Sequence, residues 1–435
     1  MKILLLALMA LAGSQPATES ATAEGRTPAG GRWAAEYPAN WNGTLLLWSR
    51  GYGSSDTVAT APRGTRELLL RRGYALAGTE YSASGWAVEE AVPDQIATLK
   101  AVSERFGPPR RVIAWGASMG GLITIALAER HPDRFVGALS SCGSIGGSIG
   151  MMNMALDGAF AFKTLLAPES DIRLVEVDDD RVNAARVRAA LEAAQRTPAG
   201  RARIALAAAL AGLPHWTDPR ASEPAEGDHA EQQRQAAAAF VFGTFLPRVD
   251  QEKRAGGIFS WNSGIDYRAQ LRASERYAHV SALYREAGLD LEADLDRLNA
   301  APRIAADPVA VAYMRDNYVP SGQLRIPVLS YHEIGDGATS ARLQTAYRDI
   351  VRRAGREDMF RAAWVRRAGH CGFAAAEHLA ALEALETRIA IDRWPASPER
   401  LNDLAEKVGE GEGRFTRFRP PPPLRPCSAF ERICR

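Results

Sequence analysis

Lysine is scarce in this chain: five of its 53 basic residues are lysines, and the formal net charge at pH 7 is +2 over 435 residues. Because basic and acidic residues nearly balance, the composition gives no reason to expect a nucleic acid or an anionic membrane surface as a partner. The arginines are spread along stretches rich in alanine and glutamate, a pattern that is typical of solvated helix faces.

Motifs for metals and nucleotides are missing as well. The chain has seven histidines and four cysteines, and no pair of histidine, cysteine or acidic residues has the close spacing of a zinc or di-metal site. The glycines at 143, 146, 147 and 150 are not followed by Lys-Ser or Lys-Thr, and the dinucleotide-binding fingerprint is absent. We therefore expect neither a metal nor a cofactor.

Long apolar runs are absent after the N-terminus. Met1-Lys2 supplies a positive charge, residues 3–11 form an apolar run too short to span a bilayer, and Ala21-Thr22-Ala23 is a small-residue cleavage signal. This pattern predicts a secretory signal peptide over residues 1–23 and a mature chain that is soluble, without a membrane segment, in the periplasm or outside the cell. An uncleaved membrane anchor is the alternative, and no cysteine stands where a lipoprotein would need one.

The segment Trp115–Gly121 has the sequence of a nucleophile elbow. A short apolar run precedes its Gly-x-Ser-x-Gly pattern, and the helix-like residues 122–130 follow it. A serine at such a strand-to-helix corner stands exposed above the sheet, and the Met119 N–H and the positive helix end point to where an oxyanion would form. The sequence predicts Ser118 as a nucleophile; the alternative is a glycine-rich turn that happens to contain serine.

A serine nucleophile needs a base and a carboxylate that orients it. Residues 326–332 have the pattern of a buried strand, and we choose Asp336 in the following loop as the acid, with Glu333 as the alternative. A second strand candidate, residues 360–365, leads to His370 on a glycine-flanked turn, which we choose as the base. The order Ser, Asp, His along the chain is the order typical of a nucleophile elbow on a parallel sheet. Three other histidines have simpler interpretations. We interpret His131 as a helix cap, His332 as a core residue and His378 as a residue on a solvated helix face.

On these motifs, residues 30–145 and 320–395 resemble the α/β-hydrolase superfamily, and the chain is similar to its secreted esterase, lipase and prolyl-oligopeptidase-like branches. The resemblance implies a mostly parallel, doubly wound α/β sheet and a triad of Ser118, Asp336 and His370, with the Met119 N–H as one oxyanion donor. The second donor would follow an early strand. Many relatives have His-Gly where this chain has Arg50-Gly51, which leaves the Tyr52 main-chain N–H in that role.

The four cysteines all lie in the predicted mature chain and allow three pairings. Cys142 and Cys371 each follow a predicted strand at the carboxyl edge of the sheet, so a bridge between them would clamp the loop of the base. Cys427 and Cys434 would then close a small loop in the tail. The other pairings and free thiols remain alternatives.

The spacing of the site residues predicts a large insertion. Ser118 and Asp336 are 218 positions apart, far more than one strand and two crossover helices need, whereas Asp336 and His370 are 34 apart. We therefore expect a core of residues 24–143 and 304–395, a helical cap over residues 144–303, and a C-terminal extension, residues 396–435, laid along the body. Helix-like periodicity in the cap is found in residues 180–196, 199–213, 231–245 and 267–286.

The predicted function is cleavage of an ester or amide bond, in a small molecule or a peptide, through an acyl-enzyme. An acyltransferase that passes the acyl group to an alcohol or amine is the alternative, and a non-catalytic binding protein on the same scaffold is less favoured because serine, acid and base are all present. The choice between ester and amide, the acyl group and the oligomeric state stay open at this point.

Overall fold

One mixed sheet organises the chain. The computed structural model describes residues 20–428 and 431, and within them nine strands form a sheet in the order β1-β2-β4-β3-β5-β6-β7-β8-β9. The neighbours from β4 to β8 pair in parallel, and β1, β2 and β9 add antiparallel edges. The strands are β1 (Ala21–Arg26), β2 (Arg32–Tyr37), β3 (Thr44–Ser49), β4 (Ala75–Glu80), β5 (Arg111–Ala117), β6 (Gly137–Ser141), β7 (Val328–Gly335), β8 (Phe360–Ala368) and β9 (Phe415–Thr416).

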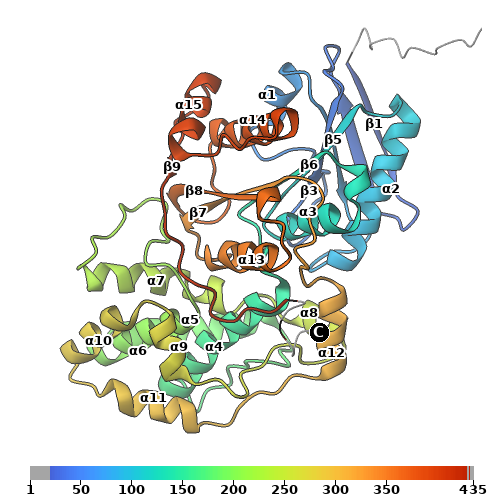
Figure 1. Cartoon of the computed structure of the whole chain (residues 1–435). Coiled ribbons are helices and arrows are strands. Elements are labelled where there is room, and N and C mark those ends of the chain that lie inside the picture. Colours follow the sequence, from blue (N-terminus) through green and yellow to red (C-terminus); the bar gives the residue numbers. More distant parts are fainter. Residues whose placement is uncertain (1–19, 429–430, 432–435) are drawn as a thin grey trace, which may run out of the picture.

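Helices cover both faces of this sheet (Figure 1). Strand β3 is buried along its whole length, and its side chains alternate between two cores, as period-2 geometry requires: Leu45 and Leu47 pack on one side and Leu46 and Trp48 on the other. The covering helices are α1 (Arg66–Arg71), α2 (Val88–Phe106), α3 (Met119–Arg130), α13 (Arg342–Arg353), α14 (Ala375–Ile391) and α15 (Pro398–Val408). This architecture confirms the predicted α/β-hydrolase fold.

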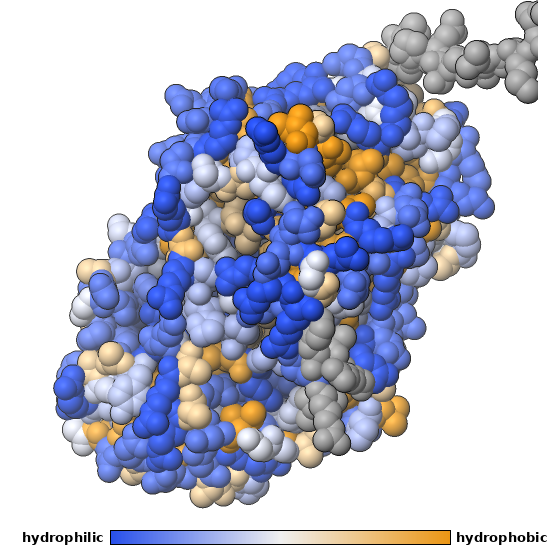
Figure 2. Space-filling view, in the orientation of Figure 1, coloured by the Kyte–Doolittle hydropathy of each residue, from blue (hydrophilic) through white to orange (hydrophobic). Residues whose placement is uncertain are grey.

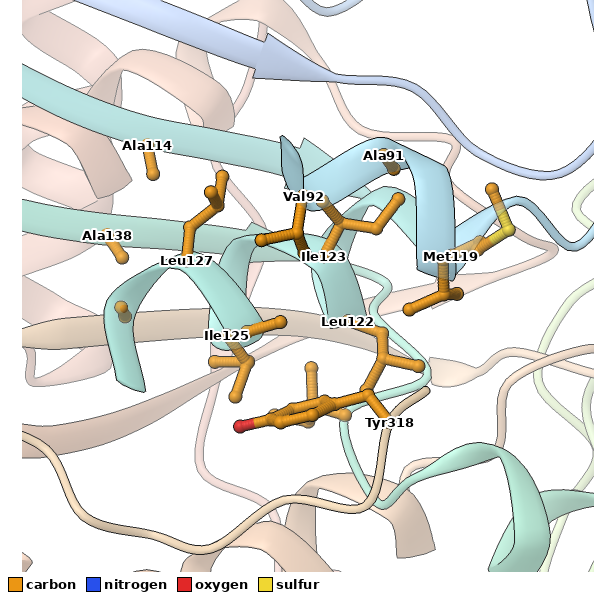
Figure 3. Packing of buried hydrophobic residues seen from close by; sticks show 14 of the residues in the cluster. Ala91, Val92, Ala114, Met119, Leu122, Ile123, Ile125, Leu127, Ala138 and Tyr318 are labelled. Carbon is orange, nitrogen blue, oxygen red and sulfur yellow. The ribbon is translucent and has the colours of Figure 1, made fainter. Parts of the chain in front are cut away.

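The core beneath the elbow explains why that turn is held firmly. Figure 3 shows Ile123 and Leu127 of α3 facing Ala114 of β5 and Ala138 of β6, with Val92 of α2 beside them. Small residues on the strands and branched residues on the helix let α3 pack closely on the sheet. The helix that begins at the elbow is therefore anchored along its buried length.

A large group of helices is inserted between β6 and β7 and builds its own hydrophobic cluster (Figure 1). Most of the face seen in Figure 2 is hydrophilic over these helices, in agreement with their arginine-rich sequence. The helices are α4 (Ser148–Leu166), α5 (Asp180–Gln195), α6 (Pro198–Leu210), α7 (His229–Thr244), α8 (Val249–Ala255), α9 (Tyr267–Ala273), α10 (Tyr277–Glu286), α11 (Leu291–Ala300) and α12 (Pro308–Asp316).

One expected helix of the insertion differs in the structure. The expected helix over residues 267–286 is divided into α9 and α10, because the chain turns at Glu275, whose φ is +61°. The expected boundary at residue 303 lies just before α12, which packs against α4 and α8 and whose buried residues Ala310, Val311 and Met314 join the hydrophobic cluster of the sheet. Asp307 caps α12 by accepting a hydrogen bond from the Val309 N–H.

The first and last described segments of the chain lie on different parts of the fold. Strand β1 begins at Ala21, so cleavage after Ala23 would remove half of its pairing with β2; residues 1–19 lie outside the described residues. The tail runs from β9 down to the inserted helices (Figure 1). There Arg425 pairs with buried Asp157 of α4 at 2.6 Å and donates to the Trp261 carbonyl oxygen at 2.7 Å. None of the helices in the described part is long and apolar enough to cross a membrane.

Candidate active site

Ser118 occupies the sharp corner between β5 and α3. Its backbone has φ +58° and ψ −123°, a conformation that non-glycine residues rarely adopt. A Cβ on Gly116 would lie 2.2 Å from the Gly120 carbonyl oxygen, and one on Gly120 would lie 2.0 Å from the Ser49 carbonyl oxygen. Both glycines are therefore required for the turn to close, as the Gly-x-Ser-x-Gly pattern predicts.

Three side chains that are distant in the sequence meet above this corner. His370 Nε2 lies 2.9 Å from Ser118 Oγ, and His370 Nδ1 lies 2.8 Å from Asp336 Oδ2. With Nδ1 protonated, the imidazole donates to the carboxylate and accepts from the serine hydroxyl. The structure thus joins the three predicted residues in one hydrogen-bonded chain.

The Asp336 carboxylate is held by its own loop. It is fully buried and accepts hydrogen bonds from the Ala338 N–H at 2.8 Å and from the Thr339 N–H and hydroxyl at 3.0 and 2.9 Å. Burial alone would raise the pKa of Asp336, but His370 and these donors outweigh it and lower the pKa below its ordinary value. The carboxylate is therefore ionised at neutral pH.

His370 is tuned by the same contact. Burial alone would lower its pKa, but the charge of Asp336 and the hydrogen bond to it more than offset burial, so the pKa is raised above its ordinary value of 6.5. An imidazole with this environment can accept a proton near neutral pH and hold it as a stabilised cation.

Glu333, the alternative acid, lies elsewhere. Its Oε1 accepts a hydrogen bond of 2.6 Å from the Gly372 N–H, and its Oε2 is buried without a partner among the described residues. Burial, followed by the nearby Asp336 charge, raises the pKa of Glu333 well above its ordinary value, so this side chain is neutral. Glu333 therefore holds the loop that follows His370 through the Gly372 N–H.

Two further histidines are buried behind the site. His332 bonds the Thr339 carbonyl oxygen through Nε2 and lies 3.5 Å from Asp336 Oδ2, so its expected place in the core is correct. The interpretation of His378 as part of a solvated helix face is wrong: it is 5% exposed, and its Nδ1 meets the Tyr331 hydroxyl at 2.5 Å. Burial lowers the pKa of His378 to about 3. Helix α14 is covered on that side by the sheet, which the local pattern did not indicate.

The two residues expected to supply oxyanion donors line the cavity of Ser118. Met119 is the first residue of α3, where a backbone N–H has no acceptor within the helix, and Tyr52 lines the same cavity as Ser118. A Cβ on Gly51 would lie 3.3 Å from the Ser118 Cβ, so the Gly51-Tyr52 backbone passes directly over the serine.

Arg50 contacts this backbone from a buried position. It is 9% exposed, pairs with Glu80 at 2.7 Å, and donates from Nη1 to the Gly51 carbonyl oxygen at 2.9 Å. In a trans peptide the C=O of one residue and the N–H of the next point in opposite directions. Because the Gly51 carbonyl oxygen points toward the Arg50 guanidinium, the Tyr52 N–H of the same peptide bond points away from that guanidinium.

We expect Arg50→Met to lower kcat about 10- to 100-fold with little change in KM, because removing one oxyanion donor outright costs about 10²- to 10³-fold. Steady-state kinetics on an activated ester would measure it. The double variant R50M/E80M, which leaves no buried carboxylate unpaired, should regain thermal stability but not kcat. Recovery of kcat in the double variant would contradict a positioning role.

A disulfide clamps the loop of His370. Cys142, just after β6, is bonded to Cys371 with a Cα–Cα distance of 5.4 Å, and the Thr339 hydroxyl oxygen, which donates to Asp336, also lies 2.8 Å from the Cys142 carbonyl oxygen. These two cysteines and His370 form a cluster with the proximity of metal ligands, but both sulfurs are used in the disulfide. For the other expected pair, Cys427 is disulfide-bonded, and Cys434 lies outside the described residues.

A cavity of about 430 Å³ opens above Ser118 and His370. Its walls are largely apolar, and the inserted helix α7 supplies Phe242, whose ring lies 6.0 Å from the His370 ring. Phe242 is 57% exposed and Tyr52 43% exposed, which places them at the mouth. The other apolar residues of the wall are Trp86, Met119, Met151, Leu246 and Pro247.

Sequence reasoning missed several residues that the structure brings to this cavity. No local motif marks Phe242 of the inserted helix α7, Gln251 of the inserted helix α8, or Trp86 in the loop before α2. Thr339 was also missed, although a threonine three residues after the acid is a typical donor to a loop carboxylate. Pocket walls depend on long-range packing, so a single sequence carries little signal for them.

The fold and this site define a serine hydrolase that acts on ester or amide bonds. Over 428 residues the chain is 32% identical to an o-phthalyl amidase from Xanthobacter agilis, and the match covers 90% of this chain and 92% of that protein. Residues 71–161, which include the elbow, match the Prolyl oligopeptidase family. The chain therefore belongs to the α/β-hydrolase superfamily, in the family of that amidase.

Solved structures of esterases are also similar to this chain. An esterase from Pyrococcus furiosus is 12% identical, with 86% of this chain and 91% of that chain covered and a TM-score of 0.39. An esterase from Aspergillus oryzae is 14% identical, with 82% and 77% covered and a TM-score of 0.39.

Proposed function

We propose that the chain hydrolyses a carboxylic amide or ester through an acyl-enzyme on Ser118. The observation that carries the proposal is the continuous hydrogen-bonded chain from Ser118 Oγ through His370 to buried Asp336 at the floor of the cavity. His370 Nε2 takes the serine proton as Oγ attacks the carbonyl carbon, and the N–H groups of Met119 and Tyr52 hold the oxyanion.

The same imidazole completes both half-reactions. Protonated His370 gives its proton to the leaving amine or alcohol as the C–N or C–O bond breaks, which leaves the acyl group on Ser118. Water then loses a proton to His370 Nε2 and attacks the acyl carbon, and the serine recovers its proton as the acid product leaves. Asp336 stays ionised throughout and stabilises the imidazolium.

An aromatic acyl group suits the cavity. The name of the Xanthobacter agilis relative refers to the o-phthalyl group, which has two carbonyl groups on adjacent positions of a benzene ring. The cavity offers flat apolar walls, among them Trp86 and Phe242, and its volume of about 430 Å³ lies in the range of small-molecule sites. We therefore propose aromatic acyl amides or esters as the substrate class.

Two unpaired polar atoms on residues that line the cavity support a substrate with a polar ring substituent. Trp86 Nε1 and Gln251 Oε1 are buried and have no hydrogen-bond partner among the described residues. A buried donor left unpaired costs about 1 to 3 kcal/mol, which an acceptor on the substrate would offset. An oxygen beside the scissile carbonyl, as in a phthalyl group, is such an acceptor for the Trp86 N–H.

We also propose that the enzyme works in the periplasm or outside the cell. The signal-like residues 1–23 support this compartment, and so does the Cys142–Cys371 disulfide, because disulfides persist in oxidising environments.

Trp86→Phe tests the substrate class. Hydrolysis of 2-carboxybenzoyl and benzoyl amides is measured beside a series of p-nitrophenyl alkanoates, and the aromatic substrates should be preferred. The variant, which keeps a ring but loses the N–H, should raise KM about 10-fold for the carboxybenzoyl amide and little for the benzoyl amide.

A matched control is Trp394→Phe, remote from the cavity, where Nε1 donates to the Asp358 carbonyl oxygen at 2.9 Å. Trp394→Phe should leave KM unchanged for both the carboxybenzoyl amide and the benzoyl amide. An equal rise of KM for both amides in W86F would mean that Trp86 acts through packing, and a preference for long alkanoates would overturn the proposed acyl group.

A further inference from the structure

A second cavity, of about 160 Å³, lies on the other side of the loop that carries Asp336. Ala338 and Thr339 line the catalytic cavity, and the next residues, Ser340 to Arg342, line the second one. Its remaining walls come from the inserted helices, around residues 212–216 and 274–276, and from the tail, residues 418–421. Three separate parts of the chain therefore meet around this space.

Arginines dominate the charge of its walls. Arg342 is 2% exposed, and its two Nη atoms donate to the carbonyl oxygens of Pro422 and Ser274 at 2.7 and 2.6 Å, so neither meets a carboxylate. Its Nε is buried with no hydrogen-bond partner among the described residues.

The neighbouring groups leave this positive charge only partly balanced. Arg276 and Arg419 also line the cavity, and within residues 20–428 neither guanidinium has an ion pair. The acidic groups in the wall are Glu223, which is paired with Arg366, and the exposed Glu275. His215 contributes a buried Nδ1 that has no partner in the described structure.

The pKa values of Arg342 and His215 are lowered by burial and by the nearby positive charge of Arg276. Burial lowers the pKa of Arg342 to about 10, and the Arg276 charge adds to the effect. Burial and Arg276 likewise lower the pKa of His215 to about 4, so that this imidazole is neutral. Like charges gathered in a partly dry cavity destabilise the fold unless an anion neutralises them.

We propose that this cavity is a binding site for a small multivalent oxyanion of the phosphate class, held by Arg276, Arg342 and Arg419, with His215 as a neutral hydrogen-bonding partner. Such an anion would lie against planar guanidinium donors, which match tetrahedral oxygens well. It would connect the inserted helices, the tail and the Asp336 loop, where the Ser340 hydroxyl already donates to the Gly212 carbonyl oxygen at 3.0 Å. Binding should therefore stabilise the folded state.

Isothermal titration calorimetry and thermal unfolding with inorganic phosphate test the site, using the full chain at constant ionic strength. Phosphate and sulfate should bind with one site per chain and raise Tm, and acetate, with a single charge, should bind at least 10-fold more weakly. Arg276→Gln should weaken phosphate at least 10-fold, whereas Arg272→Gln, on the exposed side of α9, should bind as the parent does.

Fluorophosphonate labelling of Ser118 reports whether each variant is folded. Should R276Q not fold, Arg419→Gln takes its place, because that side chain is exposed. No saturable binding of phosphate, or equal affinity in the Arg276 (or Arg419) and Arg272 variants, would overturn the proposal.

Discussion

Replacing Ser118 with alanine is expected to lower kcat by about 10⁶-fold and to abolish covalent labelling by a fluorophosphonate, because the hydroxyl that His370 activates at 2.9 Å is removed. The fold should persist, since alanine loses only the Oγ and the turn is held by Gly116, Gly120 and the packing of α3. Hydrolysis of an activated ester and mass spectrometry of the labelled protein measure the two effects.

Ser103→Ala is the matched control for this variant. Ser103 lies on α2, and its hydroxyl donates to the Leu99 carbonyl oxygen of the same helix at 2.7 Å, far from the elbow. It should retain full labelling. Labelling of S118A at another residue would contradict the proposed nucleophile.

Asp336→Asn is expected to lower kcat about 10⁴-fold, because an amide can neither hold the required tautomer of His370 nor stabilise its cation. Glu333→Gln, three residues earlier, should keep activity within a few fold. Glu333 is already neutral, and the amide oxygen of glutamine can still accept from the Gly372 N–H. A large loss in E333Q together with a small one in D336N would reassign the acid.

The pH profile of the same two variants gives a second readout. Activity requires neutral His370, whose folded pKa is raised, so kcat/KM should fall as the pH drops through a value above 6.5. In D336N the raising effect of the carboxylate disappears and burial, which lowers the pKa, dominates; the acid limb should move to lower pH. The acid limb of the E333Q pH profile should lie at the same pH as that of the parent enzyme.

The elbow was predictable because its signal is local. A sharp turn needs glycines at fixed offsets from the serine, and the strand before it and the helix after it have their own short-range patterns. Asp336 and His370 were found in the same way, as polar residues just after buried runs. In a parallel sheet, the carboxyl ends of the strands share one edge, which is why such residues can be expected to meet.

Other features depend on contacts that no local pattern encodes. The periodicity of residues 375–391 indicates a helix but not that the sheet covers its His378 side, and the break at Glu275 depends on how α9 and α10 pack. The roles of Arg50 toward Gly51 and of Trp86 in the cavity wall follow from side chains that meet only in the folded chain.

The residue order alone is thus enough for the superfamily, the parallel sheet, the existence of a large helical insertion and, for the hydrogen-bonded chain, Ser118, His370 and two candidate acids. Tertiary packing decides which acidic residue reaches His370, which inserted residues line the cavity, and where arginines from three segments gather behind the Asp336 loop. The physical reason is that turns and periodicities arise from neighbours in sequence, whereas burial, ion pairing and pKa shifts arise from neighbours in space.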